Sequence, residues 1–409
     1  MVSCLAASEH CSALCRDSPA VITGVAGTQP LPPARTVPGR HFDASRFREC
    51  NGKNLATGIA CRRRSNGHTA SGSHVYLSPM FIRFLILAVC LQLLAGTGRA
   101  NADPLFDQDA GPLAGIYNLV DSTEGANLIS KGRVAWSLSS ITASHSASAR
   151  QGEESLVFDG ETTRAELRLR YAPNERLELG FELPYAWHSR GRLDTLIDTW
   201  HDVFGLPGGN RSVRGQDLLE YRYENATAVP LDFTSSSSGI GDIRLSAGWM
   251  LSGSARHRRA LRFAVTLPTG DAEELLGSDA LTLGFGVAGD LANRGTSHRW
   301  SFYYRLHATW LDEPALLPNL YEDWILHVAG GFGWAATDWL DLRAQVLART
   351  ATHNSDLQPI GDPAVILSFG GNVRMGDRYT LSLSVGEDLW VESSPDVSFQ
   401  LSLRYRPQD

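Results

Sequence analysis

The chain has 409 residues, of which 43% are hydrophobic and 20% are charged, so it can bury a large core or span a bilayer as a barrel. All 6 cysteines lie before residue 91, which excludes a disulfide framework, a cysteine zinc site and a thiol nucleophile from the rest of the chain. Residues 103–409 carry a net charge of −14, and this acidic balance disfavours binding to nucleic acid.

The first hundred residues divide into two parts. Residues 1–79 show no sustained hydrophobic period and are rich in Pro, Gly, Ser and Arg, which predicts a disordered or untranslated extension. Residues 80–102 have a basic start, an apolar run from 84 to 95 and an Ala-Asn-Ala end, which are the parts of a secretory signal peptide. We therefore expect translation to start at Met80 and cleavage near Ala102, with a genuine N-terminal extension as the alternative.

After a Pro/Gly-punctuated stretch at 103–131, expected to be a periplasmic lead-in, apolar and polar residues alternate repeatedly through 132–409. This period of two is typical of strands with one apolar face. About twelve such runs occur, and they cover residues 132–145, 163–171, 177–187, 243–249, 261–267, 281–287, 302–310, 324–334, 340–348, 365–375, 379–385 and 397–405.

The links between these runs are alternately short and long. Compact turns, such as residues 172–176 and 376–378, alternate with longer links near 147–160, 188–239, 268–279, 312–322 and 352–362, and 392–396 is a short exception. Short turns at one rim and long loops at the other are typical of an all-β transmembrane antiparallel barrel with both chain ends in the periplasm.

Aromatic residues favour the same fold. Nine of the 10 tryptophans fall mainly near run ends, where an interfacial girdle would place them: Trp136, Trp187, Trp249, Trp300, Trp310, Trp324, Trp334, Trp339 and Trp390. A soluble sandwich, with these residues in its core, is the alternative. No apolar stretch after residue 102 is long enough for a membrane-spanning helix.

The alternation also predicts which side chains face the interior of a barrel. The candidates for a polar lumen are Glu166, Arg168, Glu178, Glu182, Arg244, Arg305, Arg343 and Arg404. Their neighbours Leu167, Leu179, Leu245 and Leu401 are then expected to face lipid.

One segment of the long link at 188–239 breaks the period of two. Apolar residues at spacings of three and four predict a short amphipathic helix, ended by the glycine-rich stretch from Gly205 to Gly209. This candidate mouth helix carries Leu193, Ile197, Trp200, His201 and Phe204. Packing within the loop is its ordinary interpretation, and capping the mouth, plugging the lumen or lying on the membrane are the alternatives.

The stretch His201-Asp202-Val203-Phe204-Gly205-Leu206-Pro207, with Gly209 and Arg211, resembles the DUF3187 family of uncharacterised proteobacterial envelope proteins. Residues 238–245 and 267–271 are less specific and resemble other outer-membrane barrels, including the phenol-degradation meta-pathway group. The resemblance implies an outer-membrane-type barrel over nearly all of 103–409, but it brings no activity and no site residues.

Together these patterns predict a protein of the Gram-negative outer membrane. The expected partners are outer-membrane lipid and lipopolysaccharide, the barrel assembly machinery and a small solute, and nucleic acid is excluded. Barrels often finish on an aromatic residue, whereas here Tyr405 is followed by four more residues, so recognition by the assembly machinery is either weaker or tolerant of the tail.

Enzymatic chemistry finds little support in the sequence. The stretch from His353 to Asp356 has a lipase-like His/Ser pairing, and His201 with Asp202 could act as a catalytic base. The acidic loop at 271–279 could bind calcium. A solvated loop is the ordinary interpretation of each. We expect no catalytic residue, no metal and no cofactor, and the leading hypothesis is a channel or uptake barrel for small solutes. The alternatives are a structural or adhesive envelope barrel and a barrel hydrolase.

Overall fold

The computed structural model describes residues 104–117, 125–205, 217–254, 257–292, 299–389 and 393–407. The N-terminal extension and the signal peptide expected from the sequence lie outside these residues and stay predictions. Within the described part of the chain, no helix is both long enough and apolar enough to cross a membrane.

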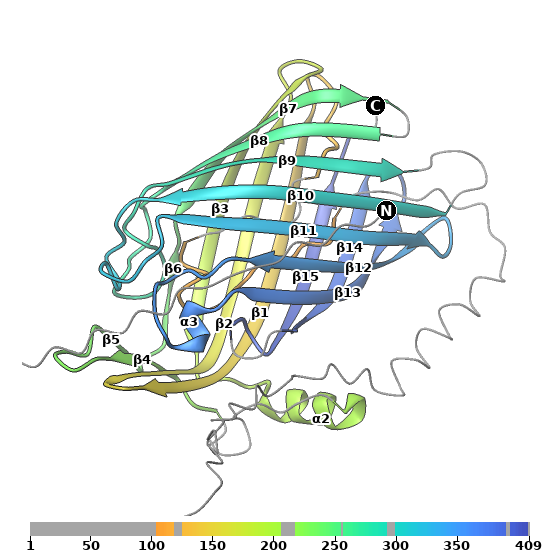
Figure 1. Ribbon diagram of the computed structural model, residues 1–409. Coiled ribbons are helices and arrows are strands. Elements are labelled where there is room, and N and C mark those ends of the chain that lie inside the picture. The colour runs from red at the N-terminus through yellow and green to blue at the C-terminus, as the bar shows by residue number, and fades with distance from the viewer. Residues whose placement is uncertain are drawn as a thin grey trace, which may run out of the picture. The chain divides into compact units, whose positions relative to one another are not determined.

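Twelve antiparallel strands close into a barrel (Figure 1), which confirms the predicted fold class. Around the ring, β1 pairs with β2, β2 with β3 and β3 with β7, and the order then follows the sequence to β15, which pairs back with β1. The strands of the ring are β1 (Val134–Gln151), β2 (Glu154–Tyr171), β3 (Leu177–Ser189), β7 (Ile243–Gly253), β8 (His257–Leu267), β9 (Thr282–Ala292), β10 (Trp300–Leu311), β11 (Trp324–Ala335), β12 (Leu340–Arg349), β13 (Ala364–Met375), β14 (Tyr379–Asp388) and β15 (Val397–Tyr405).

The two faces of the barrel wall differ as the alternation predicts. On β15, Leu401 is 46% exposed whereas its neighbour Gln400 is 3% exposed, because successive side chains of a strand point to opposite faces. The exposed positions of the wall are large and apolar all round the ring, among them Leu138, Leu167, Leu179, Leu245, Phe263, Phe285, Leu306, Leu326, Leu383 and Leu401.

We call the rim with the compact links the turn end and the opposite rim the loop end. β1 begins at Val134 and β15 ends at Tyr405, and both of these residues lie at the turn end. Trp249 and Trp339 lie at the turn end and Trp324 at the loop end, and all three are exposed. The wall therefore carries tryptophan at both rims.

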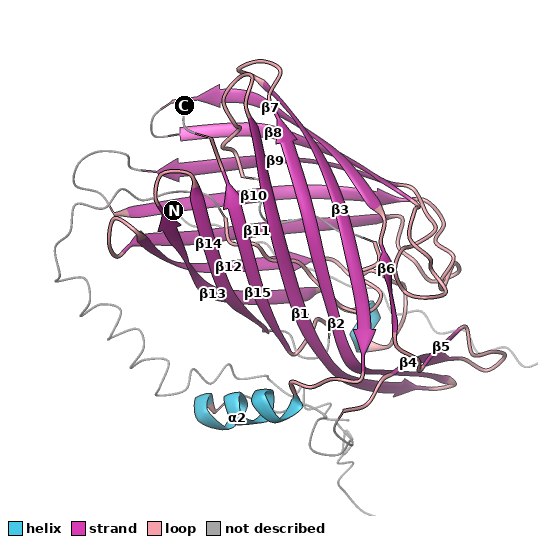
Figure 2. Ribbon diagram, turned by 180° about the vertical axis from the view of Figure 1, so that it is seen from behind, coloured by secondary structure: helices cyan, strands magenta, loops and turns pink. Residues whose placement is uncertain are grey.

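The prediction of a long link at 147–160 is wrong, because most of these residues are strand. β1 and β2 have 18 residues each and remain paired out to Gln151 and Glu154. The charged, glycine-containing sequence is typical of a loop, but the two arms pair directly with each other. Figure 2 shows β4 (Glu220–Glu224) and β5 (Leu231–Phe233) beside this extension, where β4 pairs with β2.

The long link between β3 and β7 contains the predicted helix, α2 (Asp194–Phe204), and a short strand, β6 (Ser237–Ile240). Glu161 of β2 anchors the start of the helix, since its Oε1 accepts hydrogen bonds from the backbone N–H groups of Arg192 and Leu193. Gly205 follows the helix with a positive φ of 66°, which is the usual way for a helix to end.

A hydrophobic cluster, which we call the mouth core, lies at the loop end. It joins the extension of β1 and β2, the strands β4 and β5, and the loops that contain Leu275, Leu317 and α3 (Gln358–Gly361). Tyr221 of β4 is fully buried in it and stacks on Phe233 of β5, with ring centroids 5.9 Å apart. The residues that form the mouth core are buried, like those in the interior of a soluble domain.

Candidate functional site

The inner wall of the barrel holds a network of buried charges. Arg168 on β2 donates to Glu166 at 2.7 Å and to Glu182 on β3 at 2.6 Å, and Arg262 on β8 donates to Glu178 on β3 at 2.8 Å. Burying a charge costs several kcal/mol unless a partner offsets it, so roughly equal numbers of arginines and carboxylates are needed here. The inner wall is therefore polar and held in fixed geometry.

The polar interior of the barrel contains a peptide that is not part of the strand wall. Residues 104–117, which we call the lumen segment, run inside the barrel as the orange trace of Figure 1. Leu105, Asp107 and Tyr117 have no exposed surface at all. The stretch expected as a lead-in on the periplasmic side is thus in large part enclosed by the strands.

The lumen segment reaches from one end of the barrel to the other. Near the turn end, Arg404 of β15 donates to the carbonyl of Pro104 at 3.3 Å. Farther along, Arg164 of β2 donates to the carbonyl of Gly115 at 3.2 Å. At the loop end, Oη of Tyr117 lies 3.0 Å from Nε2 of His353.

Asp107 is the centre of the contacts that hold the lumen segment. Its Oδ2 accepts a hydrogen bond from Ser368 Oγ on β13 at 2.6 Å and one from Gln345 Nε2 on β12 at 3.4 Å, and its Oδ1 accepts from Gln400 Nε2 on β15 at 3.4 Å. Three strands thus converge on one carboxylate.

Burial raises the pKa of Asp107 to about 7, although the hydrogen bonds from Ser368 and Gln345 act in the opposite direction. Removing a carboxylate from water penalises its charged form, and hydrogen bonds to neutral groups return only part of that loss. Protonation of Asp107 therefore falls in the physiological range of pH.

The two residues after Asp107 make further polar contacts on opposite sides of the lumen. Gln108 donates to Glu166 of β2 at 2.9 Å, and Asp109 accepts from Nε of Arg349 on β12 at 2.5 Å. The segment is thereby attached across the barrel. Besides Tyr117, its apolar residues Leu113, Ala114 and Ile116 belong to the mouth core.

A second stretch, residues 125–133, leads from the lumen to β1. Arg262 donates to the carbonyl of Gly125, and Glu178 accepts from the backbone N–H of Ile129 at 2.8 Å. At the turn end, Arg406 donates to the carbonyl of Asn127 at 2.8 Å. The same wall carboxylate, Glu178, thus serves both the ionic network and this stretch.

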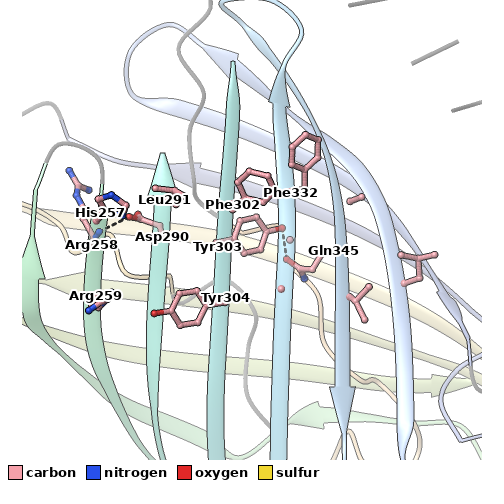
Figure 3. A pocket seen from close by; sticks show the side chains of 15 residues that line it. His257, Arg258, Arg259, Asp290, Leu291, Phe302, Tyr303, Tyr304, Phe332 and Gln345 are labelled. Carbon is pink, nitrogen blue, oxygen red and sulfur yellow. Dashed lines mark hydrogen bonds between the residues drawn. The ribbon is translucent and has the colours of Figure 1, made fainter. Parts of the chain in front are cut away.

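A groove of about 560 Å³ opens on the wall between β8 and β13 (Figure 3). Phe302, Tyr304 and Phe332 line the groove, and so does Gly330, which has no side chain to occupy it. On the inner side, Tyr303 donates to Gln345 at 2.7 Å, and Gln345 in turn donates to Asp107. A chain of hydrogen bonds therefore joins this part of the wall to the lumen segment.

The structure places seven of the predicted lumen residues on the inner face with at most 6% exposure, and Arg404 there with partial exposure. The predicted lipid-facing residues Leu167, Leu179, Leu245 and Leu401 are 38% to 46% exposed. Glu166, Glu182, Arg168 and Arg244 come together in one cluster, in which Arg244 lies 3.9 Å from Glu182. Arg343 forms its ion pair elsewhere, with Asp341 at 3.6 Å.

The candidate mouth helix is only partly described. Ile197 is fully buried and Leu193 is half-buried, and the side chains of Trp200, His201 and Phe204 lie outside the described set. The spacing places Leu196 on the same apolar face as Ile197, but Leu196 is 52% exposed whereas Ile197 is fully buried.

The possible catalytic pairing at 353–356 does not form in this structure. Nε2 of His353 contacts Tyr117, its Nδ1 lies 2.9 Å from Thr352 Oγ1, and Ser355 Oγ donates to Glu154 at 3.2 Å. A general base needs a free nitrogen within reach of the nucleophile. Burial lowers the pKa of His353 to about 3, and nearby Arg349 acts in the same direction.

Among the described residues, no group of three or more His, Cys, Asp or Glu side chains is placed to hold a metal ion. In the acidic loop, Asp271 instead accepts a hydrogen bond at Oδ1 from the backbone N–H of Glu273 at 2.9 Å. Sequence reasoning did not single out Asp107, Asp109 or the interior histidines, because no periodic pattern marks the lumen segment and its partners lie far away in the chain.

The fold and the contents of the lumen define a class: closed antiparallel barrels with an apolar outer face, a polar inner face and an internal peptide. Within that class the chain belongs to the DUF3187 family, whose members are described as proteins of unknown function and whose model matches residues 81–407. The predicted family membership is confirmed.

Among solved structures, the chain is similar to a COG4313 outer membrane channel from Pseudomonas putida F1, with 18% identity over 69% of this chain and 97% of that one and a TM-score of 0.45. It is also similar to the KdgM porin, with 7% identity over 66% and 99% and a TM-score of 0.35. A third is the toluene transporter TodX of P. putida, with 12% identity over 70% and 95% and a TM-score of 0.33. A comparison with proteins of curated function finds no match.

Proposed function

We propose that the chain is an outer-membrane channel for small solutes whose pathway is closed by its own lumen segment. The observation that supports this proposal is the polar inner wall and the peptide that runs along it. The lumen segment extends from the turn end to the loop end and is held by hydrogen bonds to side chains. A barrel that needed only a solid core could use apolar residues there at lower cost.

The outer face supports the membrane part of the proposal. A strand needs about 9 to 11 residues to cross the hydrocarbon layer at a tilt. The strands of the ring have 9 to 18 residues and present exposed leucine and phenylalanine on their outer face. Closure of the ring leaves no strand edge unpaired, as lipid requires.

A disulfide between the lumen segment and the wall tests the channel. Asp107 Oδ2 and Ser368 Oγ lie 2.6 Å apart, so the lumen segment and β13 are adjacent at these two positions, and loss of free thiols on oxidation shows whether cysteines placed there are bridged. In planar bilayers we expect the variant D107C/S368C to conduct under reducing conditions, because Asp107 no longer holds the segment, and to lose that conductance on oxidation.

The single variants D107C and S368C serve as matched controls, and both should conduct regardless of redox state. Heat-modifiable migration in SDS gels shows that each variant is a folded barrel. If the reduced double variant neither conducts ions nor admits sugars and amino acids in liposome-swelling assays, the channel proposal is rejected.

A structural envelope barrel is the second candidate. The complete burial of Leu105, Asp107 and Tyr117 favours it, because side chains so enclosed make the lumen segment part of the packed interior. This candidate predicts that redox state changes the thermal stability of the double variant and leaves conductance at zero.

A further inference from the structure

Two histidines face each other on the inner wall. His307 of β10 and His327 of β11 are direct partners in the strand register, and their ring centroids are 6.4 Å apart. We call them the imidazole pair. His327 is 5% exposed, and Nδ1 of His307 and Nε2 of His327 are buried with no hydrogen-bond partner among the described residues.

Two glycines on the neighbouring strand leave room for one ring of the imidazole pair. His307 lies over Gly284 and Gly286 of β9, where a Cβ atom would come within 2.6 Å of Cε1 and 2.5 Å of Cδ2 of the ring. Any larger residue at these two positions would push the ring into the lumen. The position of His307 is therefore set by the neighbouring strand.

The charges around the imidazole pair are positive. Arg305 and Arg244 act electrostatically on both rings, and Arg349 acts on His327. These arginines are not without counter-charges: Arg244 lies 3.9 Å from Glu182, Arg349 pairs with Asp109, and Arg305 acts on Asp107. The charged side chains that act on both rings are arginines, which favour an anion beside the imidazole pair and repel metal cations.

Neutral imidazole carries one N–H donor, and which nitrogen holds it is set by the available acceptor. The two unpartnered nitrogens lie on neighbouring rings, and each can therefore act as a donor to an acceptor group of a ligand. A planar carboxylate offers two oxygens to such donors, and a guanidinium nearby strengthens the contact.

We propose that the imidazole pair, with Arg305 and Arg244, forms a binding site in the lumen for the carboxylate group of a small organic anion. The inference rests on the proposed channel for its biological meaning, since it names the class of solute. The binding itself can be measured in a barrel that does not conduct.

The experiment uses protein labelled with ¹³C at histidine Cε1 and refolded into detergent in the presence of sodium acetate or benzoate, so that the anion is present before the barrel closes. Sodium is kept constant with chloride. The signals of His307 and His327, assigned by their loss in H307Q and H327Q, should shift saturably with carboxylate. The signal of the exposed His257 should stay in place.

In H307Q/H327Q we expect binding, measured by equilibrium dialysis of ¹⁴C-benzoate, to weaken at least about tenfold. R305Q should weaken it as well, and the matched control H257Q should bind like the wild type. Equal shifts at His257, or unchanged dialysis in the double variant, would overturn the site. Binding of inorganic phosphate in preference to both carboxylates would overturn the class of ligand.

The result also separates the two proposals. Saturable binding to the wild type, with no conductance of the reduced D107C/S368C variant, supports the site and rejects the channel. Conductance with no carboxylate binding supports the channel and rejects the site.

Discussion

Tyr117 and His353 meet at the loop end of the barrel, where the hydroxyl oxygen of the tyrosine lies 3.0 Å from Nε2 of the histidine. The first residue ends the lumen segment and the second belongs to the loop between β12 and β13, 236 residues later in the chain. This contact therefore joins the internal peptide to the mouth core.

The pH dependence of this contact follows from the buried state of His353. Its pKa is lowered to about 3 in the folded protein, so the neutral ring contributes stability above the unfolded pKa of about 6.5. That contribution is lost as the pH falls from about 6.5 toward 3. We expect the apparent melting temperature in detergent to fall over this window, and to fall less in H353Q. An identical decrease in both proteins would contradict the assignment.

Asp107 has the opposite dependence. Its pKa is raised to about 7, so the contribution of its protonated form is complete below about pH 4 and is lost as the pH rises through 7. The lumen segment should then be held more weakly at pH 8 than at pH 5. Single-channel recordings should show a conductance that rises over this interval in the wild type and stays level in D107N. An equal rise in D107N would mean that another group controls the segment.

The apolar outer face predicts a depth-dependent cost for charge. Leu401 is 46% exposed in the middle part of β15, so L401R should lower the free energy of unfolding in lipid vesicles by about 2–4 kcal/mol. Leu218 is also exposed but precedes β4, outside the ring, and L218R is the matched control with little expected effect. Equilibrium unfolding in guanidinium chloride measures both, and equal costs would argue against a lipid-facing β15.

Orientation can be read from single cysteines in the part of the chain that has none of its own. Ala226, between β4 and β5, and Glu175, between β2 and β3, are both exposed and lie at opposite ends of the barrel. A membrane-impermeant maleimide added to intact cells should label A226C and leave E175C unlabelled, because short turns face the periplasm in such barrels. The reverse pattern would invert the topology.

The wall was predictable from the sequence, since alternation is local: Leu401 and Gln400 are neighbours and their fates follow from the period of two. The extension of β1 and β2 was not, because the stretch that contains Gly152 and Glu153 is polar and is stabilised by pairing and by β4.

The contents of the lumen were also beyond sequence reasoning. Asp107 takes its partners from positions 345, 368 and 400, and contacts over such separations leave no periodic trace. The pairing of His307 with His327 depends on the register of β10 against β11, which the sequence pattern alone does not fix to the residue.

The seam between β1 and β15 has a consequence for biogenesis. The first and last strands of the ring must meet to close it, yet Ser368 and Gln400, which hold Asp107, arrive only with β13 and β15. We therefore expect the filling of the interior and the sealing of the seam to coincide late in assembly, when the last strands of the ring enclose residues 104–117. Backbone pairing joins each strand of the ring to its neighbours without help from the lumen segment, so a chain without residues 104–117 should still close into the same ring, around water.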